Sequence, residues 1–196
     1  MTVNDEALMR AVRAGDLGKL GDLFDRYHVA LFDFLNRMTG RRDVAEDLVQ
    51  EVFLRILKYR ATYRDDARFE TWVFRIARNA RADYFTRRDT VEALSDEALA
   101  SPDEALGPEG ELERHGETVL LRRALMTLRE DRRELIILAR YRGMKHEAIA
   151  ELLGIDVGAV KVRIHRALKE LREIFLRISE TPVCDVKTPP RSLPTI

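Results

Sequence analysis

The sequence is short of cysteine, with only Cys184 among its 196 residues. A single cysteine excludes an internal disulfide and any zinc site that is built from several cysteines. The four histidines, His28, His115, His146 and His165, are scattered without metal-ligand spacing, and no glycine-rich phosphate loop is present. We therefore predict that the protein is not an enzyme and binds no metal and no cofactor.

Long apolar runs are missing as well. No stretch approaches the roughly 20 apolar residues that are needed to span a bilayer. The first residues, Met1 to Glu6, are acidic where a secretory signal would be basic. We therefore expect no membrane insertion and a cytoplasmic location.

A net charge is also absent, because 34 basic and 34 acidic side chains cancel. Their distribution along the chain is uneven. Residues 91–116 contain 8 acidic groups and 1 basic group, whereas residues 117–180 contain 14 basic and 10 acidic groups. The total charge gives no hint of a polyanionic partner. The local charge, however, shows that residues 91–116 are acidic and residues 117–180 are basic.

The sequence predicts an all-α fold, because glycine is sparse in the periodic segments and strand-like alternation is not found. We expect helices over about residues 4–14, 16–38, 43–59 and 68–88, and again within about 117–178. Asp43 is followed three positions later by Glu46, which is the pattern of a capping box. This pattern predicts Asp43 as the N-cap of the third helix.

Residues 91–116 combine their acidic groups with two prolines, three glycines and little apolar content. Such a composition cannot offset the entropy cost of ordering the backbone, so we interpret the segment as an acidic flexible linker. It divides the chain into two small helical domains, residues 1–90 and 117–180. Four prolines lie within residues 181–196, and we expect a disordered tail there.

The C-terminal domain contains a helix-turn-helix pattern in the stretch MKHEAIAELLGIDVGAVKVRIHRALKEL. Two helices that meet at a steep angle need a small residue, a residue tolerant of positive φ and an apolar wedge. Ala150, Gly154 and Val160 supply these in order, and Asp156 is a suitable N-cap for the second helix. We expect Val160 and the residues in register with it to face inward.

The outward face of this second helix is cationic, and the sequence predicts that it reads the major groove of DNA. The candidate contacts are Lys161, Val162, Arg163, His165, Arg166 and Lys169. The alternative is that this charged face is merely solvated.

The helix expected at residues 68–88 is rich in arginine and aromatic residues. Arg75, Arg78 and Arg81 follow a spacing of three, and Asn79 lies one turn after Arg75. Cations beside aromatic residues suit single-stranded nucleic acid, although Trp72 has the spacing of a core residue and we expect it to be packed.

Three stretches, DVAEDLVQEVFLRI, FETWVFRIARN and HEAIAELLGIDVGAVKVRIHRA, carry a family resemblance. In this order, and separated by an acidic linker, they resemble the bacterial sigma-70 family factors of the extracytoplasmic-function (ECF) type. The resemblance covers about residues 5–178. It implies a dissociable subunit that binds core RNA polymerase and directs it to promoters.

The resemblance also implies roles for particular residues. The third helix would dock on the clamp coiled coil of the polymerase through Asp47, Gln50, Glu51 and Leu54, while Leu48, Val52 and Ile56 pack in the core. The minus-ten element would be met by Arg64, Arg75, Arg78, Asn79 and Arg81, with Asn79 contacting a flipped base. Arg75, Arg78 and Arg81 would hold phosphates, and the alternative is that any one of them pairs with a carboxylate such as Asp83.

The minus-thirty-five element would be read by the cationic helix, where the sequence departs from the family pattern. Val162 stands where a serine is usual, and Ala159 stands where a threonine is usual. We expect an altered promoter preference and an unchanged fold, since valine can touch a thymine methyl group.

The remaining partners are implied by the resemblance alone. Residues Glu117 to Tyr141 would meet the flap of the polymerase, the linker would run toward the RNA exit path, and an anti-sigma protein would hold the factor inactive. The alternative is a stand-alone helix-turn-helix regulator, which does not need the docking and base-capturing helices of the first domain.

Overall fold

The computed structural model describes residues 3–92 and 112–180, with side chains described for 3–88 and 116–180. The described residues contain helices and connecting turns and no strand, which confirms the all-α prediction. The elements are α1 (Asp5–Ala14), α2 (Lys19–Thr39), α3 (Arg42–Tyr59), the 3₁₀ turn η1 (Arg60–Thr62), α4 (Phe69–Glu92), α5 (Leu112–Thr127), α6 (Glu130–Ile136), the π-helical turn η2 (Ile137–Tyr141), α7 (His146–Leu153) and α8 (Val157–Glu180).

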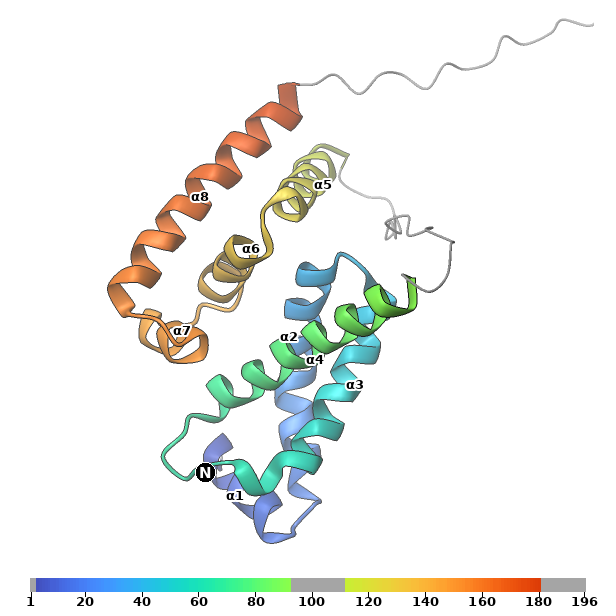
Figure 1. Cartoon of the computed structure of the whole chain (residues 1–196), viewed down its shortest axis with the longest axis vertical. Coiled ribbons are helices and arrows are strands. Elements are labelled where there is room, and N and C mark those ends of the chain that lie inside the picture. The colour runs from blue at the N-terminus through green and yellow to red at the C-terminus, as the bar shows by residue number, and fades with distance from the viewer. Residues whose placement is uncertain (1–2, 93–111, 181–196) are drawn as a thin grey trace, which may run out of the picture.

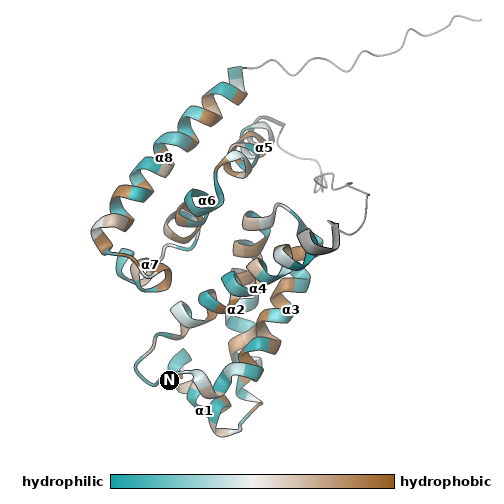
Figure 2. Cartoon of the chain, in the orientation of Figure 1, coloured by the Kyte–Doolittle hydropathy of each residue, from teal (hydrophilic) through white to brown (hydrophobic). Residues whose placement is uncertain are grey.

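Helices α1 to α4 form the N-terminal domain, a bundle in which α2 packs against α1, α3 and α4 (Figure 1). Apolar residues recur at helical spacing on these helices, and each helix therefore has an apolar side, as Figure 2 shows. Phe34 of α2 and Phe74 of α4 are both fully buried and meet edge to face with ring centroids 5.2 Å apart. Such aromatic contacts fix the angle between the helices in the centre of the bundle.

The start of α3 differs from the capping-box prediction. The N-cap is Arg41, whose backbone is extended, and no side chain caps the helix. Asp43 therefore lies in the first turn, where its carboxylate pairs with Arg41 at 2.5 Å and Glu46 pairs with Arg42 at 2.9 Å. The prediction was wrong because an arginine on either side of the helix start captured the two carboxylates that would have formed the box.

Helices α5 to α8 form the C-terminal domain, in which α8 packs against α5, α6 and α7 (Figure 1). The chain turns between Thr127 and Glu130, and α6 continues into η2, two features that periodicity did not reveal. Helix α4 extends to Glu92 and α5 begins at Leu112, so helical structure reaches into both ends of the predicted linker. The rest of that linker, residues 93–111, and the predicted tail, residues 181–196, lie outside the described residues.

The two domains pack directly against each other, which the sequence did not predict. Helix α7 lies against α4, and α2 contacts α5, α6 and η2, so that one apolar core runs through both domains. At the end of α2, Gly40 adopts a left-handed φ of 73°, and a Cβ placed there would come within 2.9 Å of the Met126 Cε. The backbone favours glycine at this position, and the tip of the flexible Met126 side chain would have to move to admit a Cβ.

Candidate functional site

The helix-turn-helix has the geometry that the sequence predicts. Gly154 ends α7 with a φ of 66°, Ala150 and Val160 are buried, and α8 begins directly after Asp156. The Asp156 Oδ1 accepts hydrogen bonds from the backbone N–H groups of Gly158 at 2.6 Å and Ala159 at 3.1 Å. The predicted N-cap is therefore confirmed, and it fixes the direction in which α8 leaves the turn.

The N-terminal half of α8 separates an apolar face from a cationic face. Val160, Ile164, Ala167 and Leu171 are buried against the rest of the domain. The six residues predicted to contact duplex DNA are all exposed: Lys161, Val162, Arg163, His165, Arg166 and Lys169.

This cationic face is unoccupied by other parts of the described chain. Its five charged or imidazole side chains make no hydrogen bond and no ion pair with any described residue. Val162 lies among them with 49% of its surface exposed. The face is therefore available to a polyanion, with one apolar contact at its centre.

The arginines of α4 are in a different environment. Arg78 Nε donates to Glu134 Oε1 at 2.5 Å, and Arg81 pairs with Glu130. Arg75 donates to the backbone oxygen of Glu151 at 3.5 Å. All three predicted phosphate-binding arginines thus face the C-terminal domain, and two of them are neutralised by its carboxylates.

Burial differs among these arginines. Arg81 is only 8% exposed, and burial lowers the pKa of its guanidinium below the ordinary value. Arg78 is half-buried and Arg75 is exposed. A charged group that is buried in this way needs its partner, because the loss of hydration is otherwise uncompensated.

The other two residues of the predicted minus-ten set remain accessible. Asn79 is exposed on α4, and Arg64 lies in the loop before α4, where it pairs with Asp66 at 2.8 Å. This pairing lowers the pKa of the Asp66 carboxyl. The structure therefore does not bring all five residues together on one open surface.

Aromatic packing holds the loop that leads into α4. Trp72 contacts Tyr63 edge to face with ring centroids 5.2 Å apart, which confirms the expectation that it is packed. Tyr63 is buried, and its hydroxyl donates to the backbone oxygen of Ala67 at 2.7 Å. Burial raises the pKa of Tyr63 to about 12.

Helix α3 presents a second accessible surface. Leu48, Val52 and Ile56 are buried, as expected for core positions. The residues predicted to dock on the polymerase form a stripe at spacings of three and four on the opposite side: Asp47, Gln50, Glu51 and Leu54.

Leu54 gives this docking stripe an apolar centre, because 61% of its surface is exposed. Glu51 within the stripe is held by Arg55 at 2.6 Å, and Arg55 also pairs with Asp83 of α4 at 2.7 Å. The stripe is thus anchored to α4 behind it.

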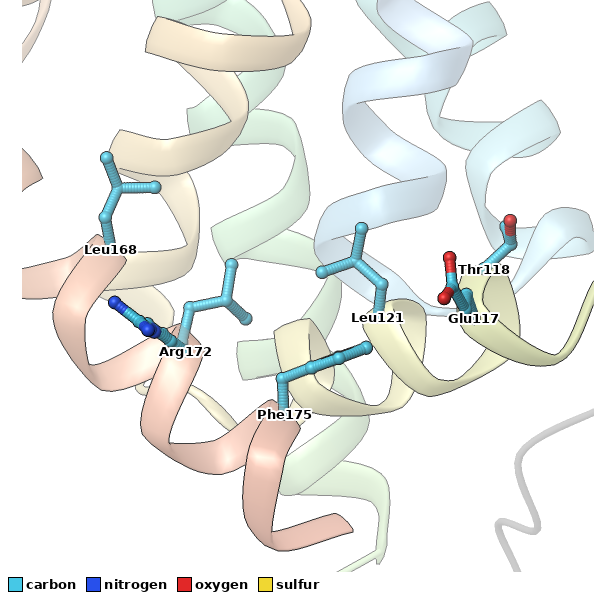
Figure 3. A pocket seen from close by; sticks show the side chains of 7 residues that line it. Glu117, Thr118, Leu121, Leu168, Arg172 and Phe175 are labelled. Carbon is cyan, nitrogen blue, oxygen red and sulfur yellow. The ribbon is translucent and has the colours of Figure 1, made fainter. Parts of the chain in front are cut away.

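An apolar groove of about 380 Å³ lies between α5 and α8. Figure 3 shows Leu121 of α5 and Phe175 of α8 on its two sides, with Arg172 beside Phe175. Val119, on the same helix as Leu121, is half exposed. The sequence predicted a polymerase contact in this part of the chain but did not predict a groove.

Arg133 of α6 joins the two domains, and nothing in the sequence singled it out. Its guanidinium donates to the backbone oxygens of Met38 at 2.8 Å, Met126 at 3.1 Å and Leu128 at 3.0 Å. These carbonyls lie at the ends of α2 and α5, where helices lack internal partners. No sequence signal separates this arginine from its neighbour Arg132, because the carbonyls that hold it come from distant segments.

Within residues 3–92 and 112–180, no group of three or more histidine, cysteine, aspartate or glutamate side chains is placed to hold a metal ion. In the same residues no helix is long and apolar enough to cross a membrane.

Two families match parts of the chain. The Sigma-70 region 2 family matches residues 23–91, which cover most of α2 to α4. The Sigma-70 region 4 family matches residues 118–171, which include the helix-turn-helix. The two matched regions together cover more than half of the chain and fall on the two domains separately.

Curated relatives extend the similarity over nearly the whole chain. The RNA polymerase sigma factor CarQ of Myxococcus xanthus is 36% identical over 170 residues, which cover 85% of this chain and 95% of that protein. The ECF RNA polymerase sigma factor ShbA of Streptomyces griseus is 34% identical over 178 residues, with 86% and 93% covered.

Solved structures show the same arrangement of helices. CnrH, solved in complex with the cytosolic domain of CnrY, superposes with a TM-score of 0.68 at 25% identity and covers 90% of this chain and 99% of CnrH. The sigma factor RpoE, solved with the anti-sigma factor NepR from Bartonella quintana, gives 0.67 at 26% identity, with 80% and 96% covered. With both conserved regions matched in order and relatives above 30% identity over most of its length, the chain belongs to the sigma-70 family of RNA polymerase sigma factors, in its extracytoplasmic-function type.

Proposed function

We propose that this sigma factor divides promoter recognition between α8, which reads the minus-thirty-five element, and α4 with its preceding loop, which binds the minus-ten strand. Sigma factors bind core RNA polymerase and direct it to promoters, and they do not catalyse a chemical reaction themselves. The domain organisation that we propose is residues 1–90 for docking and minus-ten recognition and 117–180 for minus-thirty-five recognition. The observation that carries the proposal is the cationic face of α8, which is exposed and without a partner among the described residues.

In the minus-thirty-five element, Lys161, Arg163 and Arg166 would contact phosphates and guanine edges. These side chains project from the first turns of α8, next to the Asp156 cap, where a recognition helix usually enters the major groove. Val162 would touch a thymine methyl group, which favours an A·T pair at the position that a serine would read by hydrogen bonding.

In the minus-ten element, Asn79 would bind a base that has left the stack. Its amide is exposed on α4, and an amide offers both a donor and an acceptor to the edge of a base. Arg64 in the loop, together with Arg75, Arg78 and Arg81 on α4, would hold the backbone of the non-template strand.

Docking on core polymerase would use the stripe on α3 that is formed by Asp47, Gln50, Glu51 and Leu54. An exposed leucine surrounded by carboxylate and amide groups has the composition of an interface with an apolar centre and a polar rim. The flap of the polymerase would meet the second domain in the groove between α5 and α8, where Leu121 and Phe175 offer apolar surface.

Control by an anti-sigma protein is the last part of the proposal. The similar structures of CnrH and RpoE hold those sigma factors in complex with CnrY and NepR. We extend this to the present chain and expect the anti-sigma partner to cover the α3 stripe and the α5/α8 groove. Since sigma factors act on DNA, we also propose a cytoplasmic location.

The docking proposal is tested by gel filtration with bacterial core RNA polymerase. The full chain should co-migrate with the core enzyme, and Asp47→Ala/Leu54→Ala should abolish co-migration. Asp25→Ala/Val29→Ala is the matched control, because it also removes one exposed carboxylate and one exposed aliphatic side chain, on the outer side of α2.

Each outcome of this experiment has a distinct meaning. If the double variant still co-migrates, the docking surface is not the α3 stripe. If the folded wild-type chain itself fails to co-migrate, the alternative of a stand-alone helix-turn-helix regulator becomes the better account.

A further inference from the structure

The loop before α4 is held from outside by α1. Residues 63–68 connect η1 to α4, and they include Arg64, which we place at the minus-ten strand. At the start of this loop, Arg13 of α1 donates to the backbone oxygen of Tyr63 and to Asp65 Oδ1, both at 2.7 Å. One guanidinium thus joins a backbone oxygen and a carboxylate that are two residues apart in the loop.

The far end of the loop is held by the same helix. Glu6 Oε1 accepts a hydrogen bond from the backbone N–H of Phe69 at 3.2 Å. Phe69 is the first residue of α4, and the first N–H groups of a helix have no partner within it. Glu6 and Arg13 are seven residues apart, which places them two turns apart on one face of α1. Helix α1, which packs against η1 and α4, therefore anchors the loop at both ends (Figure 1).

Between these two anchors the tip of the loop is exposed. Arg64 and Asp66 pair with each other at 2.8 Å, and within the described residues neither makes a hydrogen bond or ion pair outside the loop. The backbone N–H of Ala67 donates to the backbone oxygen of Arg64 at 3.1 Å, which closes a tight turn. The position of this turn relative to α4 therefore depends on the packing of Tyr63 and on the two anchors from α1.

The anchors lie outside the part of the chain that matches the Sigma-70 region 2 family. That match covers residues 23–91 and includes the loop and α4, whereas α1 ends at Ala14. The loop is thus inside the matched region, and the side chains that hold it come from a helix before that region.

We propose that Arg13 and Glu6 are positioning residues for minus-ten recognition, which hold the loop so that Arg64 and Asn79 meet the strand at fixed relative positions. This inference rests on the proposed minus-ten role of the loop and α4. A site that distinguishes one base from another has to be held to within about 0.5 Å. Loss of an anchor therefore weakens the choice of base, although neither anchor has to touch DNA.

The first test measures the loop in the full chain, without DNA or polymerase. Trp72 is the only tryptophan of the chain, and it packs edge to face on Tyr63, so its fluorescence reports on the loop. Arg13→Lys keeps the positive charge but loses the planar fork that joins two acceptors. Quenching of Trp72 by acrylamide should rise at least about twofold, because a loosened loop opens more often.

The matched control is Arg10→Lys. Arg10 lies on α1 between Glu6 and Arg13, is exposed, and makes no hydrogen bond or ion pair with a described residue. The two substitutions are identical in charge and in chemistry, so they differ only in the contacts that are lost. Equal quenching in the two variants would overturn the proposal.

Glu6 is tested through a conservative variant. Glu6→Gln keeps a side-chain oxygen that accepts from the N–H of Phe69, and its quenching should match the wild type. Glu6→Ala removes the acceptor, and quenching of Trp72 should rise. Equal quenching in these two variants would show that the hydrogen bond to Phe69 does not hold the loop, which overturns the role of Glu6.

The second readout is the choice of base by the full chain bound to bacterial core RNA polymerase. The complex selects from a pool of single strands of about 20 nucleotides with a randomised centre, and the retained strands are sequenced. At the position with the strongest preference, Arg13→Lys should reduce the ratio of favoured to disfavoured base at least about threefold relative to Arg10→Lys. An unchanged ratio would mean that Arg13 does not position the site, since a direct phosphate contact would survive in lysine.

Asp65→Ala separates positioning from plain electrostatics. The change removes the loop acceptor of Arg13 together with a negative charge near the strand. Electrostatics alone would tighten strand binding and leave the choice of base unchanged. Positioning requires that the base preference weakens as it does in Arg13→Lys, and a preserved preference contradicts the proposal.

Failure of the proposed function leaves a different signature. If the chain does not co-migrate with core polymerase, yet Arg13→Lys raises the quenching of Trp72 and Arg10→Lys does not, the anchors stand and the sigma function falls. If the chain co-migrates and selects strands while both variants behave alike, the sigma function stands and the anchors fall.

Discussion

Helices α4 and α8 look alike in the sequence but differ in the folded chain. Both carry rows of cations at helical spacing, and both are expected to meet nucleic acid. The five polar side chains of the α8 face have no partner among the described residues, whereas Arg78 and Arg81 of α4 are paired with carboxylates of the other domain. One face is open, and the other is occupied.

The difference follows from where the opposite charges lie. Helix α8 packs against α5, α6 and α7, and its buried side carries Val160, Ile164, Ala167 and Leu171. Its contact with α6 also includes the ion pair of Glu170 with Arg132, which leaves the cationic face untouched. Helix α4 is approached on its cationic side by α6 and α7, which bring glutamates and carbonyls with them. A row of cations on a helix therefore indicates an open binding surface only when no neighbouring helix pairs with those cations.

The largest effect is expected from Arg133→Met, which should weaken the packing of the C-terminal domain on the N-terminal domain. The arginines of α4 would then become more exposed, as the cations of α8 already are. The change removes the guanidinium that three backbone oxygens share and keeps a flexible apolar side chain in its place. Hydrogen bonds from a charged donor contribute about 1.5 to 3 kcal/mol, and we expect a loss of about 3 kcal/mol in the free energy of unfolding in urea.

Arg140→Met serves as the control for this substitution. Arg140 is exposed in η2 and makes no ion pair or hydrogen bond with a described residue, so the change should stay within about 0.5 kcal/mol. Equal losses in the two variants would show that Arg133 does not join the domains.

The open face of α8 is tested by Lys161→Ala/Arg166→Ala. Binding to duplex DNA should weaken at least about tenfold at physiological salt, and the slope of log affinity against log salt should fall by about 2, since each cation releases about one counterion. The unfolding free energy should barely change, because both side chains are exposed. A large loss of stability would mean that the face is not free.

A smaller effect is expected from Asp156→Ala, which removes the cap of α8. Losing the two hydrogen bonds to Gly158 and Ala159 should lower the unfolding free energy by about 1 kcal/mol. Asn4→Ala is the control, because it removes a comparable cap at the start of α1, where the Asn4 side chain accepts a hydrogen bond from the backbone N–H of Ala7 at 2.8 Å. Only Asp156→Ala should also weaken binding to duplex DNA, because α8 carries the cationic face; fluorescence anisotropy measures this binding.

An effect that shows only at high pH concerns Tyr63, which supports the loop before α4. Its pKa is raised to about 12 from the ordinary value of 10.0, so the folded state favours the protonated phenol. The stability from this group is present in full below about pH 10 and is lost as the pH rises toward about 12.

Urea unfolding of the wild type and Tyr63→Phe across this pH range checks the expectation. Phenylalanine has no group to ionise, so its variant should lose less stability between the two pH values. Identical pH profiles would show that the hydroxyl of Tyr63 does not contribute in this way.

Much of the fold followed from local patterns. The helices were predicted because apolar spacing persists along them, and the turn at Gly154 was predicted because few residues adopt its positive φ. Burial of Val160 followed from the same helical period, whereas Leu54, which is exposed, was singled out by the family resemblance. These features depend on residues that are close together in the sequence.

What could not be predicted depends on distant residues. The partners of Arg78 and Arg81 lie about 50 residues further along the chain, beyond the linker, and no local pattern links them. The same is true of the groove between α5 and α8, whose walls come from two separate helices. The capping box failed for a local reason, since the neighbouring Arg41 and Arg42 paired with its two carboxylates.

Gly40 shows how tightly the two domains constrain a single position. Its backbone has a conformation that disfavours other residues, and the space above it is taken by the Met126 side chain. A substitution that tolerates the backbone, such as asparagine, would still displace the methionine. In a library of all single substitutions, this site at a helix end should therefore favour glycine, with asparagine as the mildest replacement.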